Sequence, residues 1–155
     1  MKIKVFSIYS KILSALLLFF GVTSCDSADE YGTPSATYKI KGSVVSIEDD
    51  TPVEGIKAKV CIPLYENDEL KDVYYIDSIY TGNDGRFNLV FSDFPQPGKY
   101  LLKLEDVDGE KNGLYEEKTE SFDFEGLTFR GGDGKWYEGE IEKNLGTIKI
   151  TPVKD

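Results

Sequence analysis

The chain contains no histidine, and this absence narrows the chemistry that it can perform. Histidine is the general base of Ser-His-Asp and Cys-His catalysis and a usual ligand of zinc, so both kinds of site are excluded. Acidic side chains are plentiful, but the sequence favours no two of them as the paired carboxylates of glycoside hydrolysis. We therefore expect a protein that is not an enzyme.

Long hydrophobic runs are also missing, apart from one short run near the start of the chain. Ile12–Phe20 is apolar, about half the ~20 residues that a membrane-spanning helix needs. Lysines precede it, small residues follow it, and Val22-Thr23-Ser24-Cys25 resembles the lipobox of bacterial lipoproteins. Residues 1–24 are therefore predicted to be a cleaved lipoprotein signal peptide, with Cys25 as the lipidation site. The alternatives are an ordinary secretory signal and a transmembrane anchor.

Lipidation at Cys25 has a chemical basis, since a thiolate is the nucleophile that accepts a diacylglyceryl group. Each buried methylene contributes roughly 0.8 kcal/mol to membrane attachment, so several acyl chains such as palmitate anchor a small domain firmly. The expected location is the bacterial cell envelope, at the outer membrane, with the periplasmic and surface sides both open. The membrane is thus one expected partner, and a protein of the envelope is a second.

Cysteine is scarce as well, because the 155 residues include only Cys25 and Cys61. With Cys25 lipidated, Cys61 has no second cysteine, so an intramolecular disulfide is excluded. Cys61 lies in an apparent strand, Lys57–Ile62, where a buried thiol is the usual case. We expect this thiol to be unreactive, and the sequence indicates no organic cofactor.

Basic residues are outnumbered by acidic ones, 18 to 28, which gives a formal net charge of −10. The signal segment holds three lysines and no acid, so residues 25–155 carry a formal charge of −13. Nucleic acid has the same sign and is excluded as a partner. The acidic excess is typical of a solvated surface, and it also suits a cationic partner or divalent cations.

Helical periodicity is absent after the signal, and alternation of apolar and polar residues takes its place. Residues 25–35 are small, polar and acidic and read as a tether, whereas residues 36–155 form the predicted domain. The expected strands are residues 38–44, 56–62, 73–80, 87–91, 99–105, 114–124 and 146–151. They predict an all-β protein, an antiparallel seven-stranded β-sandwich. Val73–Tyr80 is apolar on both faces, so we expect this strand to be covered on both sides or to span a barrel corner.

Three stretches resemble the carboxypeptidase-regulatory, transthyretin-like sandwich. They are Thr51-Pro52-Val53-Glu54-Gly55-Ile56, Thr81-Gly82-Asn83-Asp84-Gly85-Arg86-Phe87 and Tyr100-Leu101-Leu102-Lys103-Leu104. The resemblance covers about residues 38–105. It implies that the first stretch is a hairpin turn, that the second turns into a core aromatic strand, and that the domain is a scaffold or binding module. It carries no catalytic residues over to this chain.

A second resemblance follows the order of four segments: Cys25, Tyr31–Ala36, Asp106–Tyr115 and Gly132–Gly139. This order is similar to that of radical-SAM-associated lipoproteins of Gram-negative gut anaerobes. The resemblance implies that the chain is a partner or substrate of a radical SAM maturation enzyme encoded nearby. The chain lacks the three-cysteine motif that holds the cluster of such an enzyme, so it is not the radical enzyme itself.

An acidic loop offers a candidate calcium site. Asp106, Asp108 and Glu110 alternate, with Gly109 and Asn112 beside them. Oxygen ligands at this spacing can converge on calcium, although the full twelve-residue calcium loop is not present. A solvated acidic loop is the preferred interpretation, and calcium bound by Asp106, Asp108 and Glu110 is the alternative.

The only tryptophan, Trp136, stands next to Tyr137 between glycine-rich segments. We predict that Trp136 plugs an open end of the sandwich, since burial of its large side chain contributes a few kcal/mol. The alternatives are that Trp136 and Tyr137 contact a partner, or that this segment is presented to the maturation enzyme.

Taken with the signal, these features indicate a membrane-anchored envelope lipoprotein that serves as a non-catalytic binding or assembly module. One alternative is the partner or substrate of a maturation enzyme. Another is an adhesin-like or pilus-like assembly subunit, which requires a donor strand at a terminus, and Thr147–Pro152 is short for that purpose.

Overall fold

The computed structural model describes residues 32–95, 98–109 and 111–154. Cys25, the signal segment and most of the expected tether lie outside the described residues, and the predictions about them stay predictions. In the described part of the chain, no helix is long and apolar enough to cross a bilayer. All the strands belong to one compact unit, Thr33–Asp155.

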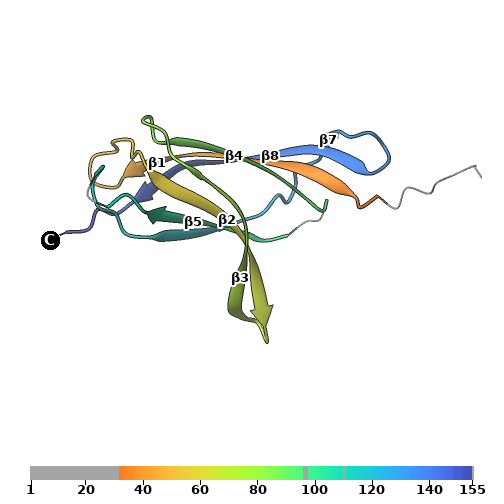
Figure 1. Ribbon diagram of the computed structural model, residues 1–155, viewed down its shortest axis with the longest axis horizontal. Helices are drawn as coiled ribbons and strands as arrows, with labels where there is room; N and C mark the ends of the chain where they lie inside the picture. Colours follow the sequence, from red (N-terminus) through yellow and green to blue (C-terminus); the bar gives the residue numbers. More distant parts are fainter. Residues whose placement is uncertain (1–31, 96–97, 110, 155) are drawn as a thin grey trace, which may run out of the picture. The chain divides into compact units, whose positions relative to one another are not determined.

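The strands alternate with short turns along the whole of this unit. Their bounds are β1 (Ser35–Ser46), β2 (Ile56–Glu66), β3 (Glu69–Tyr80), β4 (Arg86–Asp93), β5 (Tyr100–Asp106), β6 (Lys118–Phe122), β7 (Arg130–Gly131) and β8 (Tyr137–Ile150). The strands form two sheets of four, sheet A with the order β4-β1-β8-β7 and sheet B with the order β3-β2-β5-β6. The predicted all-β sandwich is therefore confirmed (Figure 1).

Four details of the sandwich differ from the expectation. The described strands number eight, because the two-residue β7 pairs with β8 at the edge of sheet A. All neighbouring strands are antiparallel except β1 and β8, which run parallel in the middle of sheet A. Strand β8 is also far longer than the expected residues 146–151, and β6 is shorter than the expected residues 114–124.

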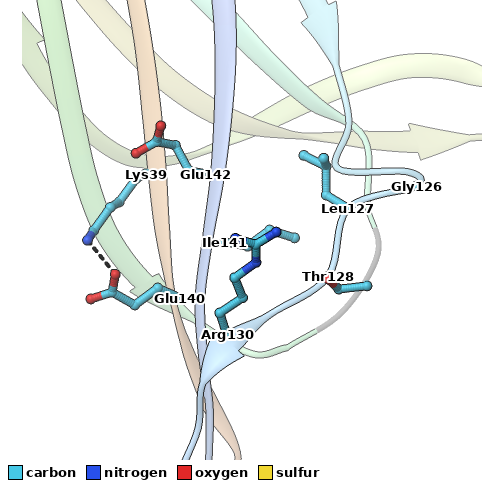
Figure 2. Close-up of a pocket in the computed structure, with 8 residues that line it drawn as sticks. All are labelled: Lys39, Gly126, Leu127, Thr128, Arg130, Glu140, Ile141 and Glu142. Atoms are coloured by element: carbon cyan, nitrogen blue, oxygen red, sulfur yellow. Dashed lines mark hydrogen bonds and ion pairs between the residues drawn. The ribbon is translucent and has the colours of Figure 1, made fainter.

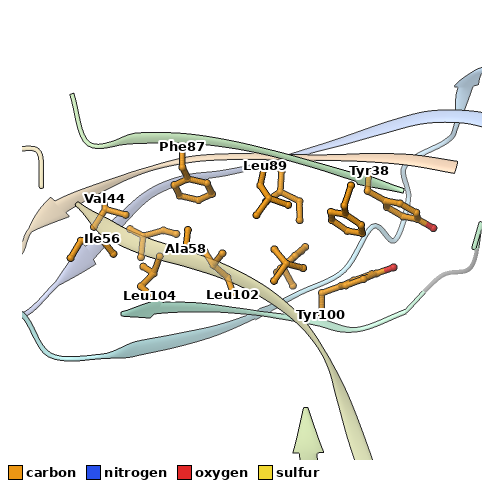
Figure 3. Close-up of a cluster of buried hydrophobic side chains, with 14 of the residues drawn as sticks. Tyr38, Val44, Ile56, Ala58, Phe87, Leu89, Tyr100, Leu102 and Leu104 are labelled. Carbon is orange, nitrogen blue, oxygen red and sulfur yellow. The ribbon is translucent and has the colours of Figure 1, made fainter. Parts of the chain in front are cut away.

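The core lies between the two sheets, as the alternation of side chains requires. Tyr38 and Ile40 of β1 and Leu89 of β4 are buried, as are Leu102 and Leu104 of β5. Figure 3 shows side chains of the two sheets pointing toward one another. Full burial of one such side chain contributes about 1.5–3 kcal/mol, so this apolar layer dominates the stability of the fold.

An aromatic cluster fills one part of the core. The ring of Tyr38 stacks on Phe91 with 5.2 Å between centroids and meets the edge of Phe124 at 5.1 Å. The Tyr38 hydroxyl donates a hydrogen bond of 2.7 Å to the carbonyl oxygen of Phe94. Tyr100 packs against the same group of rings and is buried. Tyrosine and phenylalanine thus supply the aromatic side chains of this part of the core.

The connection from β3 to β4 carries a turn that requires glycine. Gly85 has a φ of +70°, and its N–H donates a 2.8 Å hydrogen bond to the carbonyl oxygen of Gly82. A Cβ atom at Gly85 would press into the carbonyl oxygen of Val44 and lie 3.1 Å from the Cβ of Pro52. This segment leads into the buried Phe87, as the transthyretin-like resemblance implies.

The first stretch of that resemblance, Thr51–Ile56, joins β1 to β2, which belong to different sheets. It begins as the return arm of a hairpin: Pro52 bridges Val45 in antiparallel fashion, and the N–H of Ser46 donates to the carbonyl oxygen of Thr51 at 2.9 Å. The chain then crosses to sheet B. Thr81 stabilises the connection between β1 and β2 through two hydrogen bonds. Its buried hydroxyl donates to the carbonyl oxygen of Val53 at 2.7 Å and accepts from the N–H of Ile56 at 3.0 Å.

The strand Val73–Tyr80 is also misplaced by the sequence prediction. It forms most of β3, which lies at the edge of sheet B, and Tyr74, Tyr75 and Tyr80 are exposed. The expectation that this strand is covered on both sides is wrong. Ile76 and Ile79 pack against the core, whereas the tyrosines are exposed because β3 is an edge strand and its first half belongs to a hairpin that runs beyond the rest of sheet B.

Candidate functional site

The hairpin formed by β2 and β3 owes its geometry to two residues at its tip. Asn67 and Asp68 have φ values of 53° and 66°, and they separate the paired residues Glu66 and Glu69. Two successive residues with positive φ form the tight turn whose twist matches that of antiparallel strands. Short polar side chains such as Asn and Asp tolerate this conformation best.

Among the described residues, no third strand lies beside the outer half of the hairpin. The pairing of β2 with β5 ends at Cys61 and Leu101, whereas the pairing of β2 with β3 continues to the tip. Figure 1 shows this part extending away from the two sheets. Pro63 lies in it, where its missing N–H removes nothing from a neighbouring strand on the β5 side. We call residues 62–77 the distal hairpin.

The distal hairpin exposes an unusual amount of apolar surface. Five of the fourteen exposed large hydrophobic side chains in the described residues lie here, with exposed fractions from 46% for Leu64 to 63% for Tyr74. The other three are Tyr65, Leu70 and Tyr75. Single exposed hydrophobic residues are ordinary, but several within twelve residues mark an interaction surface.

These side chains occupy both faces of the hairpin. The pairs Ile62–Tyr74 and Tyr65–Leu70 lie in the ladder at positions of opposite parity, and paired residues point to the same side of a sheet. The first pair continues the core face of β2, and the second continues its outer face. Both exposed faces therefore carry apolar side chains, which explains why the sequence pattern is that of a buried strand.

Charge is the second property of the distal hairpin. It carries five acidic side chains and one lysine, a net charge of −4. The Lys71 ammonium lies 3.5 Å from the Glu66 carboxylate, and both side chains are largely exposed. Such an exposed ion pair contributes little to stability. With one lysine against five acidic side chains, the hairpin presents an acidic surface that also carries aromatic side chains.

Cys61 lies where the hairpin leaves the sheet. The thiol is buried with 2% of the residue exposed, and burial raises its pKa. A thiol in this environment stays protonated at neutral pH and is a poor nucleophile. The expectation of a buried thiol is confirmed, and the geometry gives Cys61 a packing role.

The acidic loop is held together by its own hydrogen bonds. The carboxylate of Asp106 accepts from the N–H of Tyr115 at 2.9 Å, and that of Asp108 accepts from the Asn112 amide at 2.6 Å. Glu110 lies outside the described residues, and the described ones form no group of three or more potential metal-binding side chains. Calcium binding by Asp106, Asp108 and Glu110 stays a prediction.

The tryptophan segment forms the turn between β7 and β8. Trp136 is 41% exposed, so the prediction that it plugs the end of the sandwich is wrong. The carboxylate of Asp133 organises the turn by accepting from the N–H groups of Lys135 at 2.8 Å and Tyr137 at 3.1 Å, which lowers its pKa. The Tyr137 hydroxyl donates to the Thr37 hydroxyl at 3.0 Å. A contact role for Trp136 and Tyr137 stays a prediction.

A surface hollow of about 480 Å³ lies beside β7 and β8 (Figure 2). The Lys39 ammonium on its wall is 2.5 Å from the Glu140 carboxylate, and Glu142 pairs with Lys41 at 2.6 Å. Arg130 is the other cation of the lining. Each glutamate is thus matched by a lysine of β1, as on an ordinary solvated sheet face.

Sequence reasoning missed the distal hairpin. The available signal was Asn67-Asp68 between two runs that are apolar on both faces. A two-residue turn places such runs side by side in a ribbon, and a ribbon at the edge of a sheet has fewer neighbours than a central strand.

Comparison with known proteins gives a fold likeness and no family. No family model matches the chain, and no curated protein is significantly similar to it. Among solved structures, 5-hydroxyisourate hydrolase of Klebsiella pneumoniae is 16% identical over 76% of this chain and 92% of its own, with a TM-score of 0.42. The C-terminal domain of the shaft pilin SpaA of Lactobacillus rhamnosus GG is 11% identical over 76% of this chain and 98% of its own, with a TM-score of 0.42. The pilus 2b backbone protein of group B streptococcus is 13% identical over 74% of this chain and 40% of its own, with a TM-score of 0.43.

Proposed function

We propose that the chain is a lipid-anchored protein of the bacterial cell envelope that acts as a non-catalytic binding or assembly module. The distal hairpin is its contact surface. The observation that carries this proposal is the concentration of exposed aromatic and aliphatic side chains on both faces of that hairpin.

The physical argument is the free energy of exposed apolar surface. A partner that buries Tyr65, Leu70 and Tyr74 would gain roughly 25 cal/mol of binding free energy for each Å² of apolar surface removed from water. Tyrosine is also enriched among the residues that dominate binding energies, because it combines a large apolar ring with a hydrogen-bonding hydroxyl. A surface of this kind suits a permanent or frequent partner.

The membrane attachment in this proposal depends on Cys25. The lipobox-like sequence before it supports lipidation, and the short acidic segment after it keeps the domain near the outer membrane. Changing Cys25 to Ser would leave an uncleaved or soluble precursor. Full partition of that variant with membranes, together with normal maturation, would contradict the assignment.

A second candidate function is that of a partner or substrate of a radical SAM maturation enzyme. The surface position of Trp136, in a turn that an enzyme could reach, favours it. The intact mass of the protein from its native host separates the two functions. A mass change in the polypeptide beyond its lipid supports modification, and a polypeptide of unmodified mass removes the substrate reading.

The C-terminal strand gives the pilus-like alternative no support. A subunit that donates a strand needs a terminal segment free of its own sheet. Here the C-terminal strand β8 is already paired on both sides, with β1 and β7. Donation of β8 would break sheet A.

Site-specific photo-crosslinking in the native envelope tests the contact surface. A crosslinking residue at Tyr74 is compared with one at Val90, which is also exposed but lies on β4 of the other sheet. We expect a discrete adduct from position 74 that is absent from position 90 and disappears when Tyr65 and Leu70 are changed to Ser. Equal adducts from both positions, or an adduct that survives these changes, would refute the proposed surface.

A further inference from the structure

We infer that the free edge of β3 is a docking edge for an extended polypeptide segment that carries basic side chains, and that Asp72 and Asp77 select for it. This inference rests on the proposed function, because it names the partner chemistry of the same hairpin. It is carried by the position of β3 in the sheet, by two hydrogen bonds along its edge and by the charge around it.

Strand β3 ends the order of sheet B, with β2 on one side and no strand of the described residues on the other. An edge of twelve residues with exposed aromatic side chains is a template for another strand. Proteins that do not aggregate protect such edges, often with charged side chains. The protection here consists of two aspartates.

Each aspartate accepts a hydrogen bond from the N–H of the residue that follows it. Asp72 Oδ1 lies 2.8 Å from the N–H nitrogen of Val73, and Asp77 Oδ1 lies 2.7 Å from that of Ser78. A side chain that binds a backbone donor in this way competes with a neighbouring strand for the same donor. The two carboxylates therefore hinder the pairing of β3 with any strand that has no side chain to form hydrogen bonds with them.

Charge decides which partner can remove this block. The distal hairpin has a net charge of −4, and its only lysine, Lys71, is already beside Glu66. A second copy of the chain would place the same acidic edge opposite itself, and like charges in cross-strand positions destabilise a sheet. The anionic surface of a membrane is repelled for the same reason. A cationic segment is the occupant with complementary charge.

A basic strand can open the edge by exchange of hydrogen bonds. Lysine or arginine opposite Asp72 and Asp77 draws the carboxylates into charge-assisted hydrogen bonds, which are about twice as strong as neutral ones. The N–H groups of Val73 and Ser78 then become available to carbonyl oxygens of the incoming strand. Apolar side chains between the basic ones point to the other face of the ribbon, where they pack on Tyr75.

The test uses the full chain in detergent and two labelled twelve-residue peptides, one of alternating lysine and valine and one of alternating glutamate and valine. The edge variant combines Asp72→Asn with Asp77→Asn, which keeps an acceptor for each N–H but removes both charges. The control variant combines Glu116→Gln with Glu117→Gln, which removes the same charge at exposed positions before β6. Affinity is measured by fluorescence anisotropy, and protection of the amides by hydrogen exchange.

We expect the lysine peptide to bind and the glutamate peptide not to bind. Affinity for the lysine peptide falls about tenfold or more in the edge variant, which corresponds to about 1.4 kcal/mol, and stays within about twofold in the control variant. Binding slows exchange of the Val73 and Ser78 amides. Equal losses in both variants would show mere attraction to an acidic protein and overturn the inference.

Two other outcomes also overturn it. One is the absence of binding by the lysine peptide. The other is self-association of the unliganded chain in sedimentation with both amides already protected, which would make a second copy the occupant. If the peptide fails but the crosslinked adduct at Tyr74 forms as expected, the contact surface stands and only the partner chemistry is wrong. If both fail, the proposed function falls as well.

Discussion

Replacement of Thr81 by valine should destabilise the fold markedly, although the two side chains have nearly the same shape. The Thr81 hydroxyl makes hydrogen bonds with two backbone groups, the carbonyl oxygen of Val53 at 2.7 Å and the N–H of Ile56 at 3.0 Å. Valine fills the same space but leaves both groups without it. A buried polar group that loses its partner costs about 1–3 kcal/mol, so the expected loss is about 2–4 kcal/mol.

Thr81→Ser is the matched control for this prediction. Serine keeps the hydroxyl and removes one methyl group, which costs about 1 kcal/mol. The backbone bonds of Thr81 to Ile56 and Gly55, at 2.9 and 3.1 Å, are the same in both variants. Valine should therefore be the more destabilising substitution, the reverse of what apolar burial alone predicts.

Urea denaturation followed by circular dichroism measures both variants. For a domain of this size, a loss of 2–4 kcal/mol also corresponds to a melting temperature lower by roughly 6–15 °C. If Thr81→Val is as stable as the original protein, or if Thr81→Ser is the less stable of the two, the two hydrogen bonds do not hold the β1–β2 connection as we reason.

Gly85→Ala should lower stability by about 1–3 kcal/mol in the same assay, since the positive φ and the nearby Val44 carbonyl both oppose a Cβ; an unchanged melting temperature would argue against this turn. Trp136→Ala should change the free energy of unfolding by less than about 1 kcal/mol. In the original protein, Trp136 fluorescence should be red-shifted and readily quenched by acrylamide; emission protected from acrylamide would instead support burial of Trp136 at the end of the sandwich. Burial, and then its neighbour Tyr38, raise the pKa of the Tyr100 phenol. In the unfolded chain that phenol ionises near pH 10, so its contribution is complete below pH 10 and stability falls as the pH rises above it; Tyr100→Phe should flatten this part of a stability profile. Millimolar calcium should raise the melting temperature if the acidic loop binds it, and Asp108→Asn should abolish the shift; no shift in either protein returns the loop to a solvated surface.

The sequence predicts those parts of the fold in which one face of a strand is buried. Tyr38 and Ile40 alternate with lysines, and Phe87 and Leu89 alternate with polar residues, so both strands and their core faces follow from the pattern. Gly85 could be predicted too, because a Gly-Asn-Asp-Gly turn has few other conformations.

The pattern fails where burial depends on what lies next to a strand. Val73–Tyr80 is apolar on both faces, and this pattern is the same in a covered strand and in an exposed edge strand that binds a partner. Only the structure distinguishes the two, because it shows that the pairing of β2 with β5 ends at Cys61. The first half of β8 was missed because Gly139 interrupts its apolar face. The aspartate hydrogen bonds at the β3 edge depend on side-chain rotamers, which a sequence pattern does not contain.

The central position of β1 has a mechanical consequence. The chain enters the domain at Ser35, and β1 is paired with β4 on one side and β8 on the other. A pull on the segment before Ser35, from a lipid or any other anchor, acts along the length of β1. The two ladders then resist in shear, with many hydrogen bonds loaded together rather than opened one at a time. A force applied between such an anchor and a partner on the β3 edge would therefore be resisted most strongly at β1, the strand that follows the anchored segment.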